Sequence, residues 1–173
     1  FAFVHLFDAH KPYRLGSYEA EIQNIDKLLG GFVSTLKRDG WWDRALVIVT
    51  SDHGEGMGEH GESDHGYFVY ESTLHVPLIA HWPAGLRTPG ARVTQPVGLI
   101  DVAPTILDAL KLSKPSTFEG HSLLSGKAEP VVSESTYGRD CFGWAALRAL
   151  RLGPLKYIDA PKPELYDLEK DPR

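Results

Sequence analysis

Apolar residues recur at helical spacing across residues 17–40, which is the most regular hydrophobic pattern in the chain. Ser17 is suited to cap the start of such a helix and Gly40 to end it. Acidic residues near the start and basic residues near the end match the helix dipole. The apolar positions that define the predicted buried face are Ile22, Ile25, Leu28, Leu29, Phe32, Val33 and Leu36.

Short apolar runs predict strands before and after this helix. We expect a buried strand at residues 1–7 and a second at 45–50. Because a helix connects them, the two strands should form a parallel pair with a right-handed crossover. Residues 76–82 and 93–97 read as further strands, and residues 101–112 as a helix capped by its first aspartate.

The pattern changes after residue 125, where glycine, proline and charged residues suggest a connector. Short strand-like runs separated by Gly or Pro turns follow, and they predict a small antiparallel sheet. These runs are residues 131–135, 144–150, 155–158 and 164–168. We therefore expect an α/β core over residues 1–125 and a small antiparallel subdomain of the same domain over residues 126–173.

Composition fits a single globular domain, with 173 residues of which 42% are hydrophobic. The net charge of −5 and the absence of a dense Lys/Arg run argue against nucleic-acid binding. No apolar stretch approaches the roughly 18 residues that span a bilayer. The single cysteine, Cys141, reads as a buried and inert thiol and says little about compartment.

Candidate chemistry is concentrated in a glycine-rich loop that follows the second strand, reading S-D-H-G-E-G-M-G-E-H-G-E-S-D-H-G. Asp52 and His53 begin it, so a rigid strand end would present a carboxylate next to an imidazole. That pair suits a divalent cation such as Mg²⁺, Mn²⁺, Ca²⁺ or Zn²⁺. A zinc helix of the H-E-x-x-H type is excluded by spacing, and Ser51 cannot form a triad with its own neighbours.

A second polar loop follows the first predicted strand and carries His10. In open α/β sheets, sites form beyond the carboxyl ends of parallel strands, so we expect His10 to meet Asp52 and His53 there. Glu55 and Asp64 could orient the groups of such a site, although loop carboxylates are usually solvated.

Four segments together give the chain a specific resemblance. They read F-V-H-L-F-D-A-H-K-P-Y, T-S-D-H-G-E-G-M-G-E-H-G, H-G-Y-F-V-Y-E-S-T-L-H-V-P-L-I and E-L-Y-D-L-E-K-D-P. Their order resembles the carboxyl-terminal half of a sulfatase, a member of the alkaline phosphatase-like superfamily. The resemblance covers nearly the whole chain. It implies a three-layer α/β sandwich with a mixed, largely parallel central sheet and a small C-terminal antiparallel sheet.

The resemblance also implies roles for four residues. Asp52 and His53 would coordinate one divalent metal ion, with Ca²⁺ or Mn²⁺ expected ahead of Mg²⁺ or Zn²⁺. His10 would bind an oxygen of the substrate sulfate. His65 stands where many sulfatases have a lysine, and it would donate to the substrate or to the leaving oxygen.

The nucleophile of a sulfatase is a formylglycine made in a C-x-P-S-R or similar segment, and this chain has no such segment. The resemblance therefore implies that the nucleophile lies in the amino-terminal half and that this part alone is inactive.

Three functions remain open at this point. The first is hydrolysis of sulfate monoesters, with a sulfate ester as the substrate. The second is phosphate or phosphonate ester chemistry, as in phosphodiesterases, phosphonate hydrolases or phosphoglycerol transferases of the same superfamily. The third is a non-catalytic relative. A periplasmic or extracellular location follows only from family analogy, and the oligomeric state is not indicated.

Overall fold

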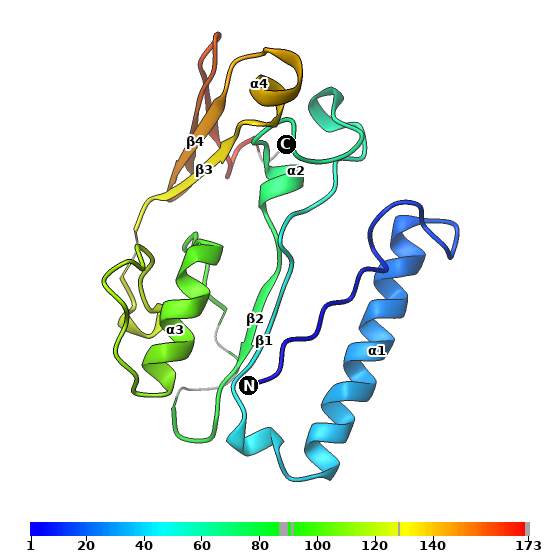
Figure 1. Cartoon of the computed structure of the whole chain (residues 1–173), viewed down its shortest axis with the longest axis vertical. Helices are drawn as coiled ribbons and strands as arrows, with labels where there is room; N and C mark the ends of the chain where they lie inside the picture. Colours follow the sequence, from blue (N-terminus) through cyan, green and yellow to red (C-terminus); the bar gives the residue numbers. More distant parts are fainter. Residues whose placement is uncertain (87–89, 91, 128, 172–173) are drawn as a thin grey trace. The chain divides into compact units, whose positions relative to one another are not determined.

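We describe the chain from a computed structural model that covers residues 1–86, 90, 92–127 and 129–171. The chain divides into two compact units (Figure 1). The first comprises residues 1–45 and 82–87, and the second comprises residues 46–81 and 88–173. The division at residue 125 that the sequence suggests stays a prediction.

The first unit is built around the long helix α1, Tyr18–Arg38. Its predicted cap is confirmed, since the Ser17 hydroxyl oxygen accepts a hydrogen bond from the backbone N–H of Ala20 at 3.2 Å. Glu21 is buried on the first turn and accepts from the backbone N–H of Leu15 at 2.7 Å. The short 3-10 helix η1, Trp42–Arg44, follows α1, and Lys37 lies over the Trp42 ring. The helix prediction is therefore correct to within two residues at either end.

Residues 1–7 precede α1 without forming a strand, contrary to the sequence prediction. Most of their large side chains are exposed, with Phe1 fully accessible and Phe3 at 80%, while Leu6 is half-buried. A parallel-sheet strand is buried by neighbours on both sides, and no described segment pairs with residues 1–7. The predicted parallel crossover from this segment into residues 45–50 is therefore not confirmed in the described residues.

The second unit contains a two-stranded sheet of β1, Val47–Thr50, and β2, Leu78–His81. The strands are antiparallel, with Val47 opposite His81 and Thr50 opposite Leu78. Both strand positions were predicted, but β2 is not buried, since Ile79 is 62% exposed. The predicted largely parallel central sheet is thus not confirmed in the described residues, and residues 93–97 form no strand.

Short helices connect the remaining parts of this unit. They are η2 (Glu59–Gly61), α2 (Glu71–Leu74), η3 (Leu99–Asp101), α3 (Val102–Ala109), η4 (Leu123–Ser125) and α4 (Tyr137–Phe142). The helix predicted at residues 101–112 is confirmed as α3, although it is shorter. Asp101 accepts from the backbone N–H groups of Gly98 and His121 and so joins the start of α3 to a distant loop. Cys141, which the sequence suggested to be buried, is exposed on the short helix α4.

The predicted antiparallel sheet is confirmed as β3 to β6, paired in sequence order. Its strands are β3 (Val131–Ser135), β4 (Leu147–Leu152), β5 (Leu155–Asp159) and β6 (Glu164–Asp167). Alternate residues of β4 and β5 are buried or half-buried, as expected for a sheet with one covered face. Ala149 and Ile158 on that face form a core with Val69, which lies between the glycine-rich loop and α2. Among the described residues, no helix is long and apolar enough to cross a membrane.

Candidate metal and substrate site

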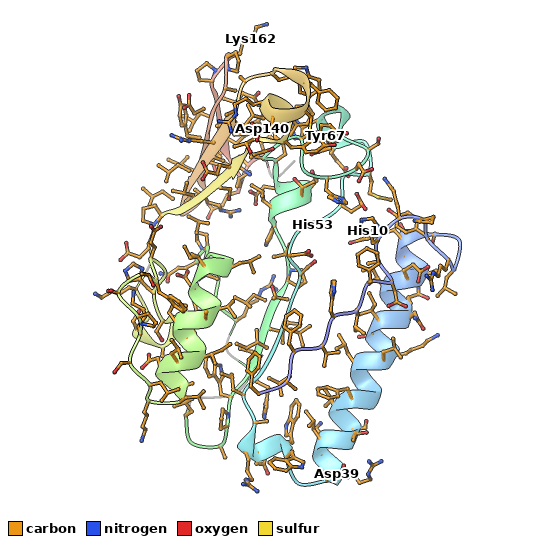
Figure 2. All side chains as sticks on the ribbon, viewed as in Figure 1. His10, Asp39, His53, Tyr67, Asp140 and Lys162 are labelled. Atoms are coloured by element: carbon orange, nitrogen blue, oxygen red, sulfur yellow. The ribbon has the colours of Figure 1, made fainter. Side chains whose placement is uncertain are left out.

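Asp52 and His53 follow Ser51, the first residue after the end of β1; His53 is labelled in Figure 2. The Ser51 hydroxyl donates to the His53 carbonyl oxygen at 2.6 Å and stiffens the turn. The backbone N–H of Gly54 then donates to the Thr73 carbonyl oxygen in α2 at 2.8 Å. A Cβ atom at Gly54 would lie 2.2 Å from the Ser72 carbonyl oxygen, so only glycine allows this close approach. The pair is therefore fixed between β1 and α2.

The side chains of Asp52 and His53 approach each other, with His53 Nε2 at 3.8 Å from Asp52 Oδ2. His53 Nδ1 lies 2.8 Å from the Gly54 carbonyl oxygen. A carbonyl oxygen only accepts, so Nδ1 carries the proton of the neutral ring and Nε2 keeps its lone pair. This outer hydrogen bond is the usual way in which proteins orient a histidine that binds a metal.

The Asp52 carboxyl group favours its ionised form. Burial raises its pKa, but this is outweighed by attraction to the adjacent His53 ring in its protonated form and by hydrogen bonds from the backbone N–H groups of Asp52 and His53 and from the Ser51 hydroxyl. The resulting pKa lies below the ordinary value of 3.8. Metal binding requires a deprotonated carboxylate, so Asp52 is in the competent state at neutral pH.

His65 lies against His53, although twelve residues separate them in the sequence. Their rings stack with centroids 4.0 Å apart and an interplanar angle of 24°. His65 Nδ1 is 3.0 Å from Asp64 Oδ1 and 3.3 Å from Glu55 Oε1. Glu55, Asp64 and His65 each offer one atom of a type that can bind a metal, and these atoms lie within 4.8 Å of one another. The structure therefore joins Asp52, His53 and His65 in one polar cluster.

The glycine-rich loop holds this cluster together by closing on itself. The backbone N–H of Gly56 donates to the Asp64 carbonyl oxygen at 2.9 Å, and that of Gly58 to the Glu62 carbonyl oxygen at 2.8 Å. These bonds bring the two ends of the loop side by side. His60 at its tip has another role, since its ring stacks on Tyr70 with centroids 3.7 Å apart.

His10 belongs to the first unit and is described there by itself. Its ring stacks on Phe7 with centroids 4.5 Å apart, and its Nδ1 lies 2.6 Å from the Lys11 carbonyl oxygen. A small pocket of about 150 Å³ adjoins it. Its lining residues are Phe7, Asp8, His10, Lys11, Pro12 and Arg14. Two cationic side chains and the imidazole make this pocket compatible with an anion, and the sulfate-binding role of His10 stays a prediction.

The donor set around Asp52 fits a divalent cation. It supplies an ionised carboxylate and an imidazole whose Nε2 lone pair is available, which are ligands shared by Ca²⁺, Mn²⁺, Mg²⁺ and Zn²⁺ sites to different degrees. Carboxylate and imidazole alone do not select one of these ions.

Sequence reasoning gave Glu55 and Asp64 only a weak orienting role. The two residues differ in exposure, since the Glu55 side chain is 5% exposed and that of Asp64 is 53% exposed. The paired glycines at Gly56 and Gly58 were the available signal that the loop doubles back. They did not by themselves indicate which carboxylate would be enclosed.

Comparison with known proteins identifies the family of this chain. The Sulfatase family profile matches residues 5–112. Arylsulfatase K of Bos taurus is 31% identical over 171 residues, which cover 90% of this chain and 31% of that protein. Choline-sulfatase of Rhizobium meliloti (strain 1021) is 36% identical over 167 residues, with 90% and 31% covered. Among solved structures, the phosphonate monoester hydrolase of Agrobacterium radiobacter superposes with a TM-score of 0.73 and 29% identity over 90% of this chain and 35% of that one.

These matches identify the fold class as alkaline phosphatase-like. Within that class, this chain belongs to the sulfatase family. The family resemblance inferred from the sequence is confirmed. The chain spans about a third of the length of the curated relatives it matches.

Proposed function

We propose that the protein containing this chain hydrolyses sulfate monoesters with the help of a bound divalent metal ion. The observation that carries the proposal is the cluster in which Asp52, His53 and His65 lie together at the end of β1. Membership of the sulfatase family supports the choice of sulfate as the anion.

In this proposal Asp52 and His53 are metal ligands, with Ca²⁺ or Mn²⁺ ahead of Mg²⁺ or Zn²⁺. A bound divalent ion would supply positive charge that stabilises the charge developing on the sulfuryl group. His65 donates to the ester oxygen, and His10 binds a non-bridging sulfate oxygen. The nucleophile, a formylglycine, is supplied by sequence outside this chain.

The proposal also concerns the wider fold. Residues 1–125 would form part of an alkaline phosphatase-like core with a largely parallel central sheet, and residues 126–173 its small antiparallel subdomain. Support comes from the superposition on the phosphonate hydrolase and from the antiparallel pairing of β3 to β6.

Phosphonate or phosphate ester hydrolysis is the second candidate. It is favoured by the phosphonate monoester hydrolase match, whose TM-score of 0.73 is accompanied by 29% identity. Both esters present a tetrahedral anion, so the same cluster could serve either reaction.

The deciding experiment uses the complete protein and measures hydrolysis of p-nitrophenyl sulfate, phosphate and phosphonate esters with and without a chelator. Asp52→Ala is compared with Asp39→Asn, which alters an exposed carboxylate at the end of α1 (Figure 2). We expect chelator-sensitive sulfate hydrolysis that falls at least about 100-fold in Asp52→Ala, because removing a metal ligand weakens the ion's binding. Asp39→Asn should keep wild-type activity.

Each alternative has a distinct result. Preferential cleavage of the phosphate or phosphonate esters would select the second candidate. Sulfate hydrolysis that resists the chelator and survives Asp52→Ala would reject the proposed metal site. Absence of turnover with every ester would favour a non-catalytic relative.

A further inference from the structure

The Glu55 carboxylate is enclosed next to the His65 ring. Only 5% of its side chain is exposed, and its Oε1 lies 3.3 Å from His65 Nδ1. A buried carboxylate is costly unless it has a polar or charged partner. The His65 ring supplies such a polar partner within the enclosed surroundings of Glu55.

The backbone around Glu55 leaves this contact little freedom. On one side of Glu55, the backbone N–H of Gly54 donates a hydrogen bond to the Thr73 carbonyl oxygen. On the other side, the backbone N–H of Gly56 donates to the Asp64 carbonyl oxygen. A Cβ atom at Gly56 would lie 2.6 Å from two carbonyl oxygens, those of Asp64 and Glu62. The two ends of the glycine-rich loop therefore approach as closely as backbone allows. This close approach sets Glu55 opposite His65.

Asp64 touches the same ring nitrogen but is a weaker constraint. Its side chain is 53% exposed, and its Oδ1 also accepts from the backbone N–H of His65 at 3.0 Å. Asp64 is adjacent to His65 in the sequence and bonded to its backbone, so it moves together with His65 and does not anchor the ring to another part of the chain. Glu55 comes from the other end of the loop, so it can fix the ring relative to His53.

We propose that Glu55 is a positioning residue that accepts a hydrogen bond from His65 Nδ1 and so turns Nε2 of that ring toward the substrate ester. Stacking on His53 fixes the plane of the ring, and Glu55 fixes its rotation within that plane. The catalytic consequence rests on the proposed ester hydrolysis. The orientation of the ring does not depend on it.

The kinetic test compares Glu55→Leu with Glu55→Gln in the complete protein. Both replacements are close to glutamate in size, but only glutamine keeps an acceptor for Nδ1. We expect Glu55→Leu to lower kcat by about 10–100-fold with little change in KM, as removal of an outer hydrogen-bond partner does at other sites, and Glu55→Gln to retain most of kcat. Glu59→Gln is the control, because Glu59 lies in the same loop and accepts from the backbone N–H of Met57.

Two further measurements separate positioning from a structural role. The loss in Glu55→Leu should be larger with phenyl sulfate than with p-nitrophenyl sulfate, since a poorer leaving group depends more on a donor at the ester oxygen. In a His65→Ala background, Glu55→Leu should cost no more activity. The proposal would be overturned if Glu55→Leu lowered activity as much in the His65→Ala background as in the wild type. It would also be overturned if Glu55→Leu and Glu55→Gln lowered kcat equally.

A crystallographic comparison decides the orientation without any turnover. In wild-type protein the ring should keep Nδ1 toward residue 55, and in Glu55→Leu it should rotate or adopt several orientations. An unchanged ring in the variant would reject the positioning role even if sulfate hydrolysis is confirmed. If instead no ester is hydrolysed while the ring rotates, the proposed function fails and the positioning role of Glu55 stands.

Discussion

Gly54 illustrates how single residues build this site. It needs no unusual backbone angle, but its α-carbon lies so close to α2 that a Cβ would be 2.2 Å from the Ser72 carbonyl oxygen. A Cβ added to Gly30, within α1, would meet no atom within 4 Å outside its own helix backbone and its chain neighbours. Packing therefore requires glycine at position 54, whereas position 30 has room for a larger side chain.

We predict that Gly54→Ala destabilises the protein by about 1–3 kcal/mol, because a new methyl group must displace backbone rather than a flexible side chain. It should also weaken metal binding, since His53 is the preceding residue. Gly30→Ala is the matched control and should stabilise by about 0.5–1 kcal/mol, because alanine is the better helix residue. Denaturant unfolding and metal titration check both. Equal effects of the two variants would contradict the close approach at Gly54.

At the scale of elements, α2 is joined to the antiparallel sheet by an ion-pair network. Glu71 at the start of α2 accepts from Lys156 of β5 at 2.8 Å and from Arg151 of β4. Lys156 is 2% exposed, and burial lowers its pKa while the contact with Glu71 opposes that shift. The short helix and the sheet are thus connected by charges that are largely removed from water.

We expect Glu71→Ala to cost about 3–5 kcal/mol, because it leaves the Lys156 ammonium buried without its carboxylate. Glu134→Ala provides the control. It removes the pair between Glu134 and Arg148 at 3.4 Å, whose side chains are 60% and 70% exposed, and should cost less than about 1 kcal/mol. Chemical denaturation of both variants gives the comparison. A small loss in Glu71→Ala would mean that Lys156 finds another partner or discharges at little cost.

For the molecule as a whole, stability at high pH depends on two tyrosines that share one carboxylate. The hydroxyl groups of Tyr70 and Tyr166 both donate to Glu164. Burial and the bond to Glu164 raise the pKa of Tyr70, and the bond to Glu164 is the main reason that the pKa of Tyr166 is raised. Tyr70 and Glu164 are 94 residues apart in sequence, so this contact exists only in the folded chain.

These shifts predict a loss of stability above about pH 10. Below the ordinary tyrosine pKa of 10.0 both states keep the phenol protons, and the full stabilisation is present. As the pH rises further, the unfolded chain releases protons that the folded protein retains, so the unfolding free energy falls. Tyr166→Phe should show a shallower fall between about pH 9 and 11 in denaturant unfolding. An identical slope in wild type and variant would contradict the raised pKa of Tyr166.

Local patterns explain which parts of the fold were predictable. Residues 17–40 form a helix as expected because apolar spacing, the Ser17 cap and the end charges all act within a few turns. The strands β3 to β6 were predictable because turns of Gly or Pro separate alternating runs. Residues 1–7 have the composition of a strand, but a strand also requires a partner, and partners are chosen far away in sequence.

The candidate site shows the same difference between features set by local sequence and features set by long-range packing. The sequence by itself determined the family, the helix α1, the small antiparallel sheet and the Asp52–His53 pair at a strand end, because each depends on residue type and short spacing. Tertiary structure alone decided that β1 pairs with β2 in antiparallel register, that His65 stacks on His53, and that Glu55 rather than Asp64 is enclosed. Hydrogen-bond partners and burial depend on how distant segments pack, and this packing is what turns loop residues into a defined cluster.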